Sequence, residues 1–212
     1  MSICVDKEEN LSKSSGFLFA FYHYSQSKNN SLFEKIVSLA TRSDCVHVAI
    51  APVHEGVYNI HAREMQKAKV LNKVYTAFMG RGFEIQEADA IMNDAYEYIF
   101  LPTSTLHFQQ GIHFLESLHG LKYNYLALPL TVLPSSVKTG YHHLESTTNT
   151  SPPHRVICSQ IGLMLFNQCV QTHMYDIDPS YCTPGELKQV LLEHAQCMVC
   201  KPRNIVIYSS EN

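Results

Sequence analysis

Tryptophan is absent from this chain, and charged residues are scarce: Asp, Glu, Lys and Arg together make up 17% of 212 residues. The net charge is −3, so the basic excess typical of nucleic-acid-binding proteins is missing and we expect no nucleic-acid partner. No apolar run approaches the ~20 residues of a membrane-spanning helix. The polar N-terminal residues 1–15 contain no apolar segment typical of a secretory signal.

The seven cysteines are odd in number and follow no repeating spacing, which favours reduced thiols over a disulfide framework. We therefore expect a reducing, cytoplasmic location. Cys197 and Cys200 form a Cys-x-x-Cys motif, but a zinc site needs a second pair of ligands, to which only Cys182 or His194 would contribute. The redox interpretation of the same motif lacks its βαβ setting. The sequence thus predicts neither a metal site nor a cofactor.

The hydrophobic fraction of 45% suits one domain with a sizeable core. We expect a flexible tail over 1–15, then a single domain over 16–212 with a loop-rich insertion near 129–153, which is either a plain surface loop or a lid. Strands are predicted near 16–22, 46–51, 57–62, 69–74, 96–101 and 204–208; helices are predicted near 32–41, 105–118, from 157 onward, and 184–194. Pro102 is expected to end the strand before it, residues 103–105 to supply the N-cap of the next helix, and Gly120 to follow its end. Thr183 and Glu186 predict a capping box at the last helix. Strands and helices without βαβ alternation predict an α+β fold.

The two alternating runs over 46–51 and 57–62 are typical of half-buried strands. The residues between them, 52–56, contain Pro and Gly and suit a hairpin loop. In the register that this loop favours, His47 lies directly opposite His61, and directly opposed residues have Cβ atoms roughly 5 Å apart. A histidine on a strand is more often structural than catalytic, so the pair indicates a catalytic site only if a third reactive group lies beside it.

Cys158 is the candidate for that third group. Two prolines just upstream, Pro152 and Pro153, indicate that the next helix begins near residue 157. A cysteine in a first helical turn faces unpaired N–H groups and the positive end of the helix dipole, so we expect its pKa to fall below the free value of about 8.5. Its own N–H would then serve as an oxyanion donor. The alternative is a small buried apolar residue.

In this scheme His47 is the general base, and His61 fixes the ring and tautomer of His47. A slip of one residue in the strand register would turn His61 to the other face of the sheet and bring Asn59 to the cleft instead.

Six short motifs follow one another in order between residues 16 and 190: Gly16–Phe19, Thr41–Ile50, Val57–Ala62, Gly120–Tyr125, Cys158–Ile161 and Thr183–Leu187. Together they resemble the circularly permuted, NlpC-type branch of papain-like cysteine peptidases, the YiiX/YaeF-like group, in which the histidine strand precedes the cysteine helix. The resemblance implies a permuted papain-like fold: an antiparallel sheet or barrel packed against helices. It also implies a catalytic triad of Cys158, His47 and His61, with Ser159, Tyr123 and Asn59 as oxyanion or cleft candidates.

The chain departs from this family at three positions. Gln160 and Asn124 replace a glutamate and an aspartate. At the position of His61 the group often has Glu, whereas the related lecithin:retinol-acyltransferase-like enzymes have His, as this chain does. Those acyltransferases typically carry Asn-Cys-Glu-His-Phe around the nucleophile, which residues 157–161 do not match.

The leading functional hypothesis is a thiol hydrolase that cleaves a peptide, isopeptide or other amide bond through an acyl-enzyme on Cys158. A lipid-directed acyltransferase or thioesterase on the same fold is the first alternative, and an apolar tunnel in place of an open cleft would distinguish it. The second alternative is a binding module without catalytic activity. The sequence leaves the substrate and the oligomeric state open.

Overall fold

The computed structural model describes residues 11–26, 32–125, 155–170 and 177–208. The strands are β1 Leu11–His23, β2 Cys45–Asn59, β3 Glu64–Leu71, β4 Val74–Phe78, β5 Gly82–Gln86, β6 Tyr96–Thr103, β7 Lys122–Tyr123, β8 Arg155–Val156, β9 Met198–Cys200 and β10 Ile205–Tyr208. The α-helices are α1 Leu32–Thr41, α2 Thr105–Ser117, α5 Cys158–Val170 and α6 Pro184–Glu193. Short 3-10 turns are η1 Tyr24–Gln26, η2 Ala88–Ile91, η3 Pro179–Tyr181 and η4 Pro202–Asn204.

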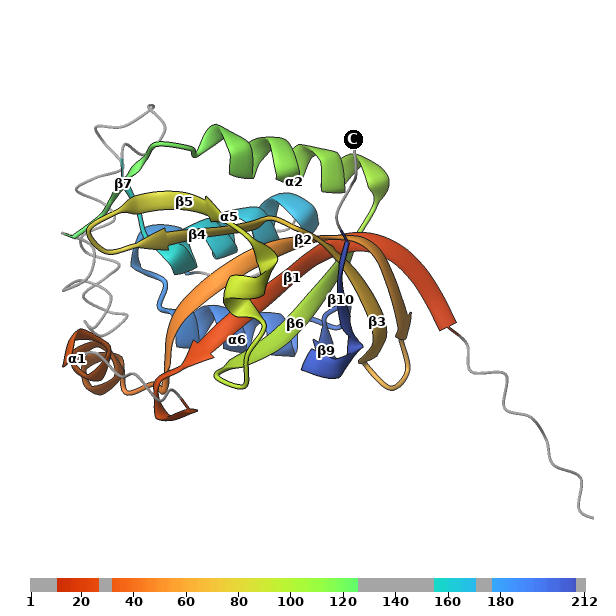
Figure 1. The fold of residues 1–212 in the computed structure, drawn as a ribbon, viewed down its shortest axis with the longest axis horizontal. Coiled ribbons are helices and arrows are strands. Elements are labelled where there is room, and N and C mark those ends of the chain that lie inside the picture. Colours follow the sequence, from red (N-terminus) through yellow and green to blue (C-terminus); the bar gives the residue numbers. More distant parts are fainter. Residues whose placement is uncertain (1–10, 27–31, 126–154, 171–176, 209–212) are drawn as a thin grey trace, which may run out of the picture.

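The strands form one large curved sheet that closes on itself. Its order is β10-β3-β9-β6-β1-β2-β4-β5, and an additional β3–β2 pairing joins β1, β2, β3, β9 and β6 into a ring. The hairpin β4–β5 extends from β2 beyond this ring, and α2, α5 and α6 pack against the sheet (Figure 1). The predicted α+β class is therefore confirmed.

Side-chain alternation along β1 divides the interior into two cores. Phe17, Phe19 and Phe21 belong to a helix-side core, which receives residues from α2, α5 and α6. Leu18 and Ala20 belong to a barrel core, which is built from strands and η2 without any of these three helices. Because successive strand residues point to opposite faces, a single buried strand contributes to both cores.

The predicted hairpin loop over 52–56 is wrong, because β2 runs through it as one continuous strand. Pro52 lies opposite Phe17, and Gly56 lies opposite Ser14 on β1. Gly56 is needed for close packing: a Cβ there would lie 2.7 Å from Met65 Cε. The glycine and proline thus fit a tightly packed, bulged strand, and the chain turns only after Asn59.

Other predicted boundaries are also corrected. β1 begins at Leu11, so the end of the expected tail belongs to the sheet. The strand that Pro102 was expected to end continues to Thr103 as β6, and the strand expected over 69–74 divides between β3 and β4. The predicted insertion at 129–153 lies outside the described residues.

The predicted helix caps at α2 and α6 are confirmed. Ser104 accepts a hydrogen bond from His107 N at 3.2 Å. Thr183 and Glu186 form a reciprocal capping box at α6. Gly120, just after α2, has a φ of 84°, the left-handed conformation expected of a residue that ends a helix.

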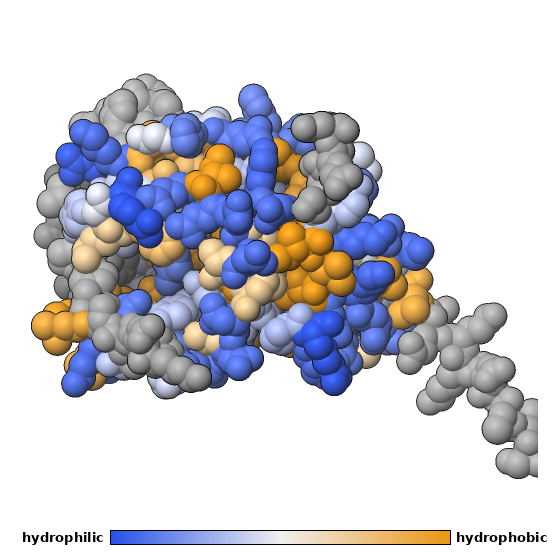
Figure 2. Space-filling view, viewed as in Figure 1, coloured by the Kyte–Doolittle hydropathy of each residue, from blue (hydrophilic) through white to orange (hydrophobic). Residues whose placement is uncertain are grey.

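None of the helices formed by the described residues is long and apolar enough to cross a membrane. The short helix α1 does expose an apolar stripe, formed by Leu32, Ile36 and Leu39, which are 76%, 55% and 70% exposed. This stripe gives the orange projection at the lower left of Figure 2, where Figure 1 places α1.

Candidate active site

The start of α5 is held from several sides, and Cys158 is its first residue. Gln160 Oε1 accepts a hydrogen bond from Ile157 N at 3.4 Å, so this glutamine caps the helix. Ser159 Oγ donates to the carbonyl oxygen of Cys182 at 2.5 Å. These contacts fix the position of the Cys158 side chain.

The Cys158 thiol is buried in the helix-side core and only 6% exposed. Burial raises its pKa to about 11, although backbone hydrogen bonds from Val48, Ser159 and Cys158 itself lower it in part. The expected fall of the Cys158 pKa below 8.5 is therefore wrong. The helix start supplies stabilising N–H groups, but the apolar core around the sulfur disfavours the thiolate more strongly.

His47 lies near the start of β2, opposite Tyr22 on β1. Its ring Nε2 is 2.8 Å from Thr76 Oγ1 on β4. The ring also stacks on Phe78, with 4.7 Å between the centroids. Burial, together with the nearby positive charge of Arg81, lowers the His47 pKa from the ordinary 6.5 to about 4. The imidazole is therefore neutral at pH 7. Its position is fixed by the contact with Thr76 and by stacking on Phe78.

His47 and Cys158 meet β2 from different faces. Val48 shares the helix-side core with Cys158, whereas Ala49 belongs to the barrel core, and alternation places the His47 side chain on the same face as Ala49. No hydrogen bond between Cys158 Sγ and the His47 ring is found among the described residues. The two groups are connected instead through Val48.

The backbone N–H and C=O groups of Val48 make this connection. Its N–H is directed at Cys158 Sγ, and its carbonyl oxygen accepts a hydrogen bond from Thr76 Oγ1 at 3.1 Å. The same hydroxyl contacts His47 Nε2. β2 and β4 pair at the single position Ile50–Tyr75, so they leave these backbone groups of Val48 free to bind side chains. The resulting path runs from the thiol through Val48 and Thr76 to the imidazole.

The predicted pairing of His47 with His61 is wrong. Asn59 ends β2, and its Oδ1 accepts hydrogen bonds from His61 N and Ala62 N, each at 3.0 Å. His61 is exposed in the turn that follows. Because an extended strand rises about 3.3 Å per residue, His47 and His61 are separated by on the order of 40 Å along the chain. Asn59, the alternative third residue, is equally remote.

The two remaining cleft candidates differ. Ser159 is only 1% exposed, and its hydroxyl already donates a hydrogen bond to the carbonyl oxygen of Cys182. Its role is therefore to stabilise the start of α5. Tyr123, on β7, shares the helix-side core with Cys158. Burial raises the pKa of Tyr123, and the nearby Cys158 raises it further.

Thr76 is the site residue that the sequence did not indicate. It is 2% exposed and lies in the middle of β4. The alternation of Val74–Phe78 is typical of a strand, but only the tertiary pairing of β4 with β2 brings this threonine to His47.

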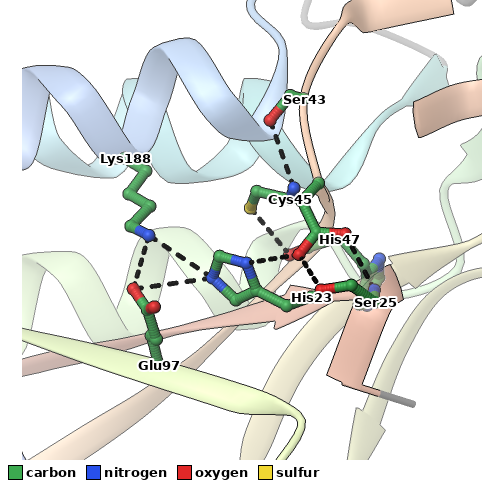
Figure 3. Close-up of polar contacts among 8 residues, drawn as sticks. His23, Ser25, Ser43, Cys45, His47, Glu97 and Lys188 are labelled. Carbon is green, nitrogen blue, oxygen red and sulfur yellow. Dashed lines mark hydrogen bonds and ion pairs between the residues drawn. The ribbon is translucent and has the colours of Figure 1, made fainter. Parts of the chain in front are cut away.

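A second polar cluster, centred on His23, lies at the same end of the sheet (Figure 3). His23 Nδ1 is 3.3 Å from Asp44 Oδ2, and its Nε2 is 3.5 Å from Glu97 Oε2 and 3.4 Å from Lys188 Nζ. Lys188 also forms an ion pair with Glu97. The cluster joins the end of β1 to β6 and α6.

Cys45 borders this cluster, since it lies opposite His23 in the β1–β2 register. Its Sγ is 3.8 Å from the carbonyl oxygen of His47, to which it donates. Burial raises the pKa of Cys45 to about 12, and Lys188 opposes that shift. A second thiol therefore lies near the first, but its environment favours the neutral form.

Comparisons with protein-family models, with curated proteins and with solved structures give no match to this chain. Within the described ranges, no three His, Cys, Asp or Glu side chains are grouped closely enough to hold a metal ion. All six cysteines of those ranges, including Cys197 and Cys200, are unbridged and buried.

Proposed function

We propose that this protein is a cysteine hydrolase with a permuted papain-like fold. Cys158 is the nucleophile and His47 the general base for cleavage of a peptide, isopeptide or other amide bond. The observation that carries the proposal is the position of Cys158: it begins a helix that packs on β2, and its sulfur faces the N–H of Val48, the residue next to His47.

The reaction begins when Cys158 Sγ attacks the carbonyl carbon of the substrate and its proton passes to His47. The tetrahedral intermediate places a negative charge on the former carbonyl oxygen, for which backbone N–H groups at the start of α5 are the available donors. The imidazolium then gives its proton to the leaving amine, and a thioester on Cys158 remains. Water, deprotonated by His47, hydrolyses this thioester and restores the thiol.

The resting pair in this mechanism is neutral. The pKa of Cys158 is raised to about 11 and that of His47 is lowered to about 4, so neither group is charged at pH 7. Proton transfer therefore accompanies attack, as in a serine hydrolase, rather than preceding it. The two side chains approach β2 from different faces, so the proposed mechanism requires a substrate complex in which the His47 ring has left its resting place and meets the sulfur.

The nucleophile is tested with p-nitrophenyl acetate, an activated ester that acetylates reactive thiols. Wild type, Cys158→Ala and Cys169→Ala are treated, and the acetylated peptide is located by mass spectrometry. Cys169 is the matched control, because it is a buried cysteine on the same helix with a pKa raised to about 12.

We expect acetylation at Cys158 in wild type and in Cys169→Ala, and its loss in Cys158→Ala. Equal acetylation of Cys158→Ala and wild type would overturn the assignment of the nucleophile. Acetylation at Cys45 would assign the reaction to the other thiol of this region.

A lipid-directed acyltransferase or thioesterase is the second candidate. The exposed stripe of Leu32, Ile36 and Leu39 favours it, because α1 directly precedes the strand that carries His47 and offers an apolar surface to an acyl chain. Rates with a p-nitrophenyl ester series from acetyl to palmitoyl, compared with peptide anilides, separate the two. A lipid enzyme gains rate with chain length and loses it in Ile36→Glu, whereas Leu106→Glu, at another exposed leucine, leaves the rate unchanged.

A further inference from the structure

The hydroxyl of Thr76 has one proton and two close neighbours. Oγ1 lies 2.8 Å from His47 Nε2 and 3.1 Å from the carbonyl oxygen of Val48. The threonine is 2% exposed, so bulk water does not compete for either contact. The direction of the single proton therefore decides which nitrogen of His47 carries a hydrogen.

Two arrangements are conceivable. If Thr76 donated to His47 Nε2, its oxygen lone pairs would face the Val48 carbonyl oxygen at 3.1 Å, and two buried acceptors would be in contact without a hydrogen between them. If Thr76 donates to the Val48 carbonyl and accepts from His47 Nε2–H, both contacts are hydrogen bonds. A carbonyl oxygen can only accept, so the second arrangement is the favourable one.

We infer that Thr76 is the positioning residue of His47: it holds the ring as the Nε2–H tautomer and leaves Nδ1 as the nitrogen that can accept a proton. This inference rests on the proposed function for the role of Nδ1, but not for the tautomer. Thr76 thus takes the role that the sequence had assigned to His61.

The surroundings of the ring agree with this role. Phe78 stacks on the His47 ring and restrains its plane, and Arg81 lies over the Phe78 ring at 4.4 Å from its centroid. In this contact the Nε2–H of His47 donates to Thr76, which passes the polarisation on to the Val48 carbonyl. The orienting group is therefore a neutral hydroxyl backed by a peptide group, rather than a carboxylate.

The tautomer is measured directly by ¹⁵N NMR of the histidine rings, with His47→Gln used to assign the signals. Thr76→Val removes the hydroxyl with little change in shape, and Thr76→Ser retains it. Thr103→Val is the matched control, because Thr103 Oγ1 is buried in a strand and has no hydrogen-bond partner among the residues that the structure describes.

At neutral pH we expect the Nε2–H form of His47 in wild type, in Thr76→Ser and in Thr103→Val, and a mixture of tautomers in Thr76→Val. We also expect Thr76→Val to reduce kcat for ester hydrolysis by about tenfold to a hundredfold, as is typical when a group that orients a histidine is lost, with KM little changed. Thr76→Ser should restore most of the rate.

The inference is overturned by an Nδ1–H tautomer in wild type, or by an unchanged tautomer in a folded Thr76→Val variant. These results are independent of any substrate. A confirmed Nε2–H tautomer together with an unreactive Cys158 would instead refute the proposed hydrolase and leave the tautomer assignment intact. Thermal melts of all variants separate loss of the hydrogen bond from loss of the fold.

Discussion

The two ends of β2 carry histidines in contrasting environments. At the start of the strand, His47 is partly buried, bonded to Thr76 and stacked on Phe78. Just beyond the other end, His61 is exposed in a turn whose backbone is capped by Asn59. Both histidines belong to alternating runs in the sequence, 46–51 and 57–62. The difference shows that burial and partners, supplied here by β4, distinguish a candidate catalytic histidine from a surface one.

The largest expected difference between the two ends is in reactivity. His47→Gln should lower the rate of Cys158 acylation by about a hundredfold or more, since general-base catalysis contributes roughly 10² to 10⁴. His61→Gln should stay within about twofold of wild type, because its backbone anchors a turn far from the thiol. Stopped-flow acylation with p-nitrophenyl acetate measures both rates. Comparable losses in the two variants would mean that His61 reaches the site after all.

Stability should show the next largest effect, at Gly56 in the middle of β2. Gly56→Val should lower the free energy of unfolding by about 3 kcal/mol, because the new side chain enters space held by Met65 and Phe100. Gly120→Ala, where a Cβ meets no atom of the described residues within 4 Å, should cost only about 1 kcal/mol for its left-handed backbone. Urea unfolding measures both. If Gly56→Val were as mild as Gly120→Ala, residues 52–56 would behave as a loop.

A pH dependence should mark the His47 end of the strand. The His47 pKa is about 4 in the folded protein and near 6.5 when unfolded, so the unfolded chain binds the extra proton between these values. Stability is therefore fully present above about pH 6.5 and falls as the pH drops toward 4, by at most about 3 kcal/mol. Unfolding free energies of wild type and His47→Gln over this range test it. The free energy of unfolding of His47→Gln should fall less steeply than that of wild type as the pH drops. If the two proteins showed the same dependence on pH, the lowered pKa of His47 would be contradicted.

The smallest effect is expected at the other end. Asn59→Ala removes two hydrogen bonds from the turn, to His61 N and Ala62 N. We expect a loss of about 1 kcal/mol, since the freed N–H groups are exposed and can bind water. The acylation rate should not change. A slower reaction in a normally stable Asn59→Ala protein would restore Asn59 as a site residue.

Much of the local structure followed from sequence patterns. Ser104 and Thr183 marked helix starts because their side chains satisfy N–H groups within the same turn, and Cys158 was placed at a helix start by the prolines before it. These interactions are local in the chain, so short motifs determine them. The acid–base character of Cys158 was not predictable, because the apolar core that raises its pKa is assembled from distant elements.

The course of β2 shows where local patterns fail. Pro52 and Gly56 are typical of a turn, but here the proline faces β1 and the glycine makes room for Met65 and Phe100. The sequence alone identified His47 as a strand residue and Cys158 as a helix-start thiol. Tertiary structure alone decided that His61 is remote and that Thr76 is the partner of His47, because strand register and the pairing of β4 depend on packing between residues far apart in the chain.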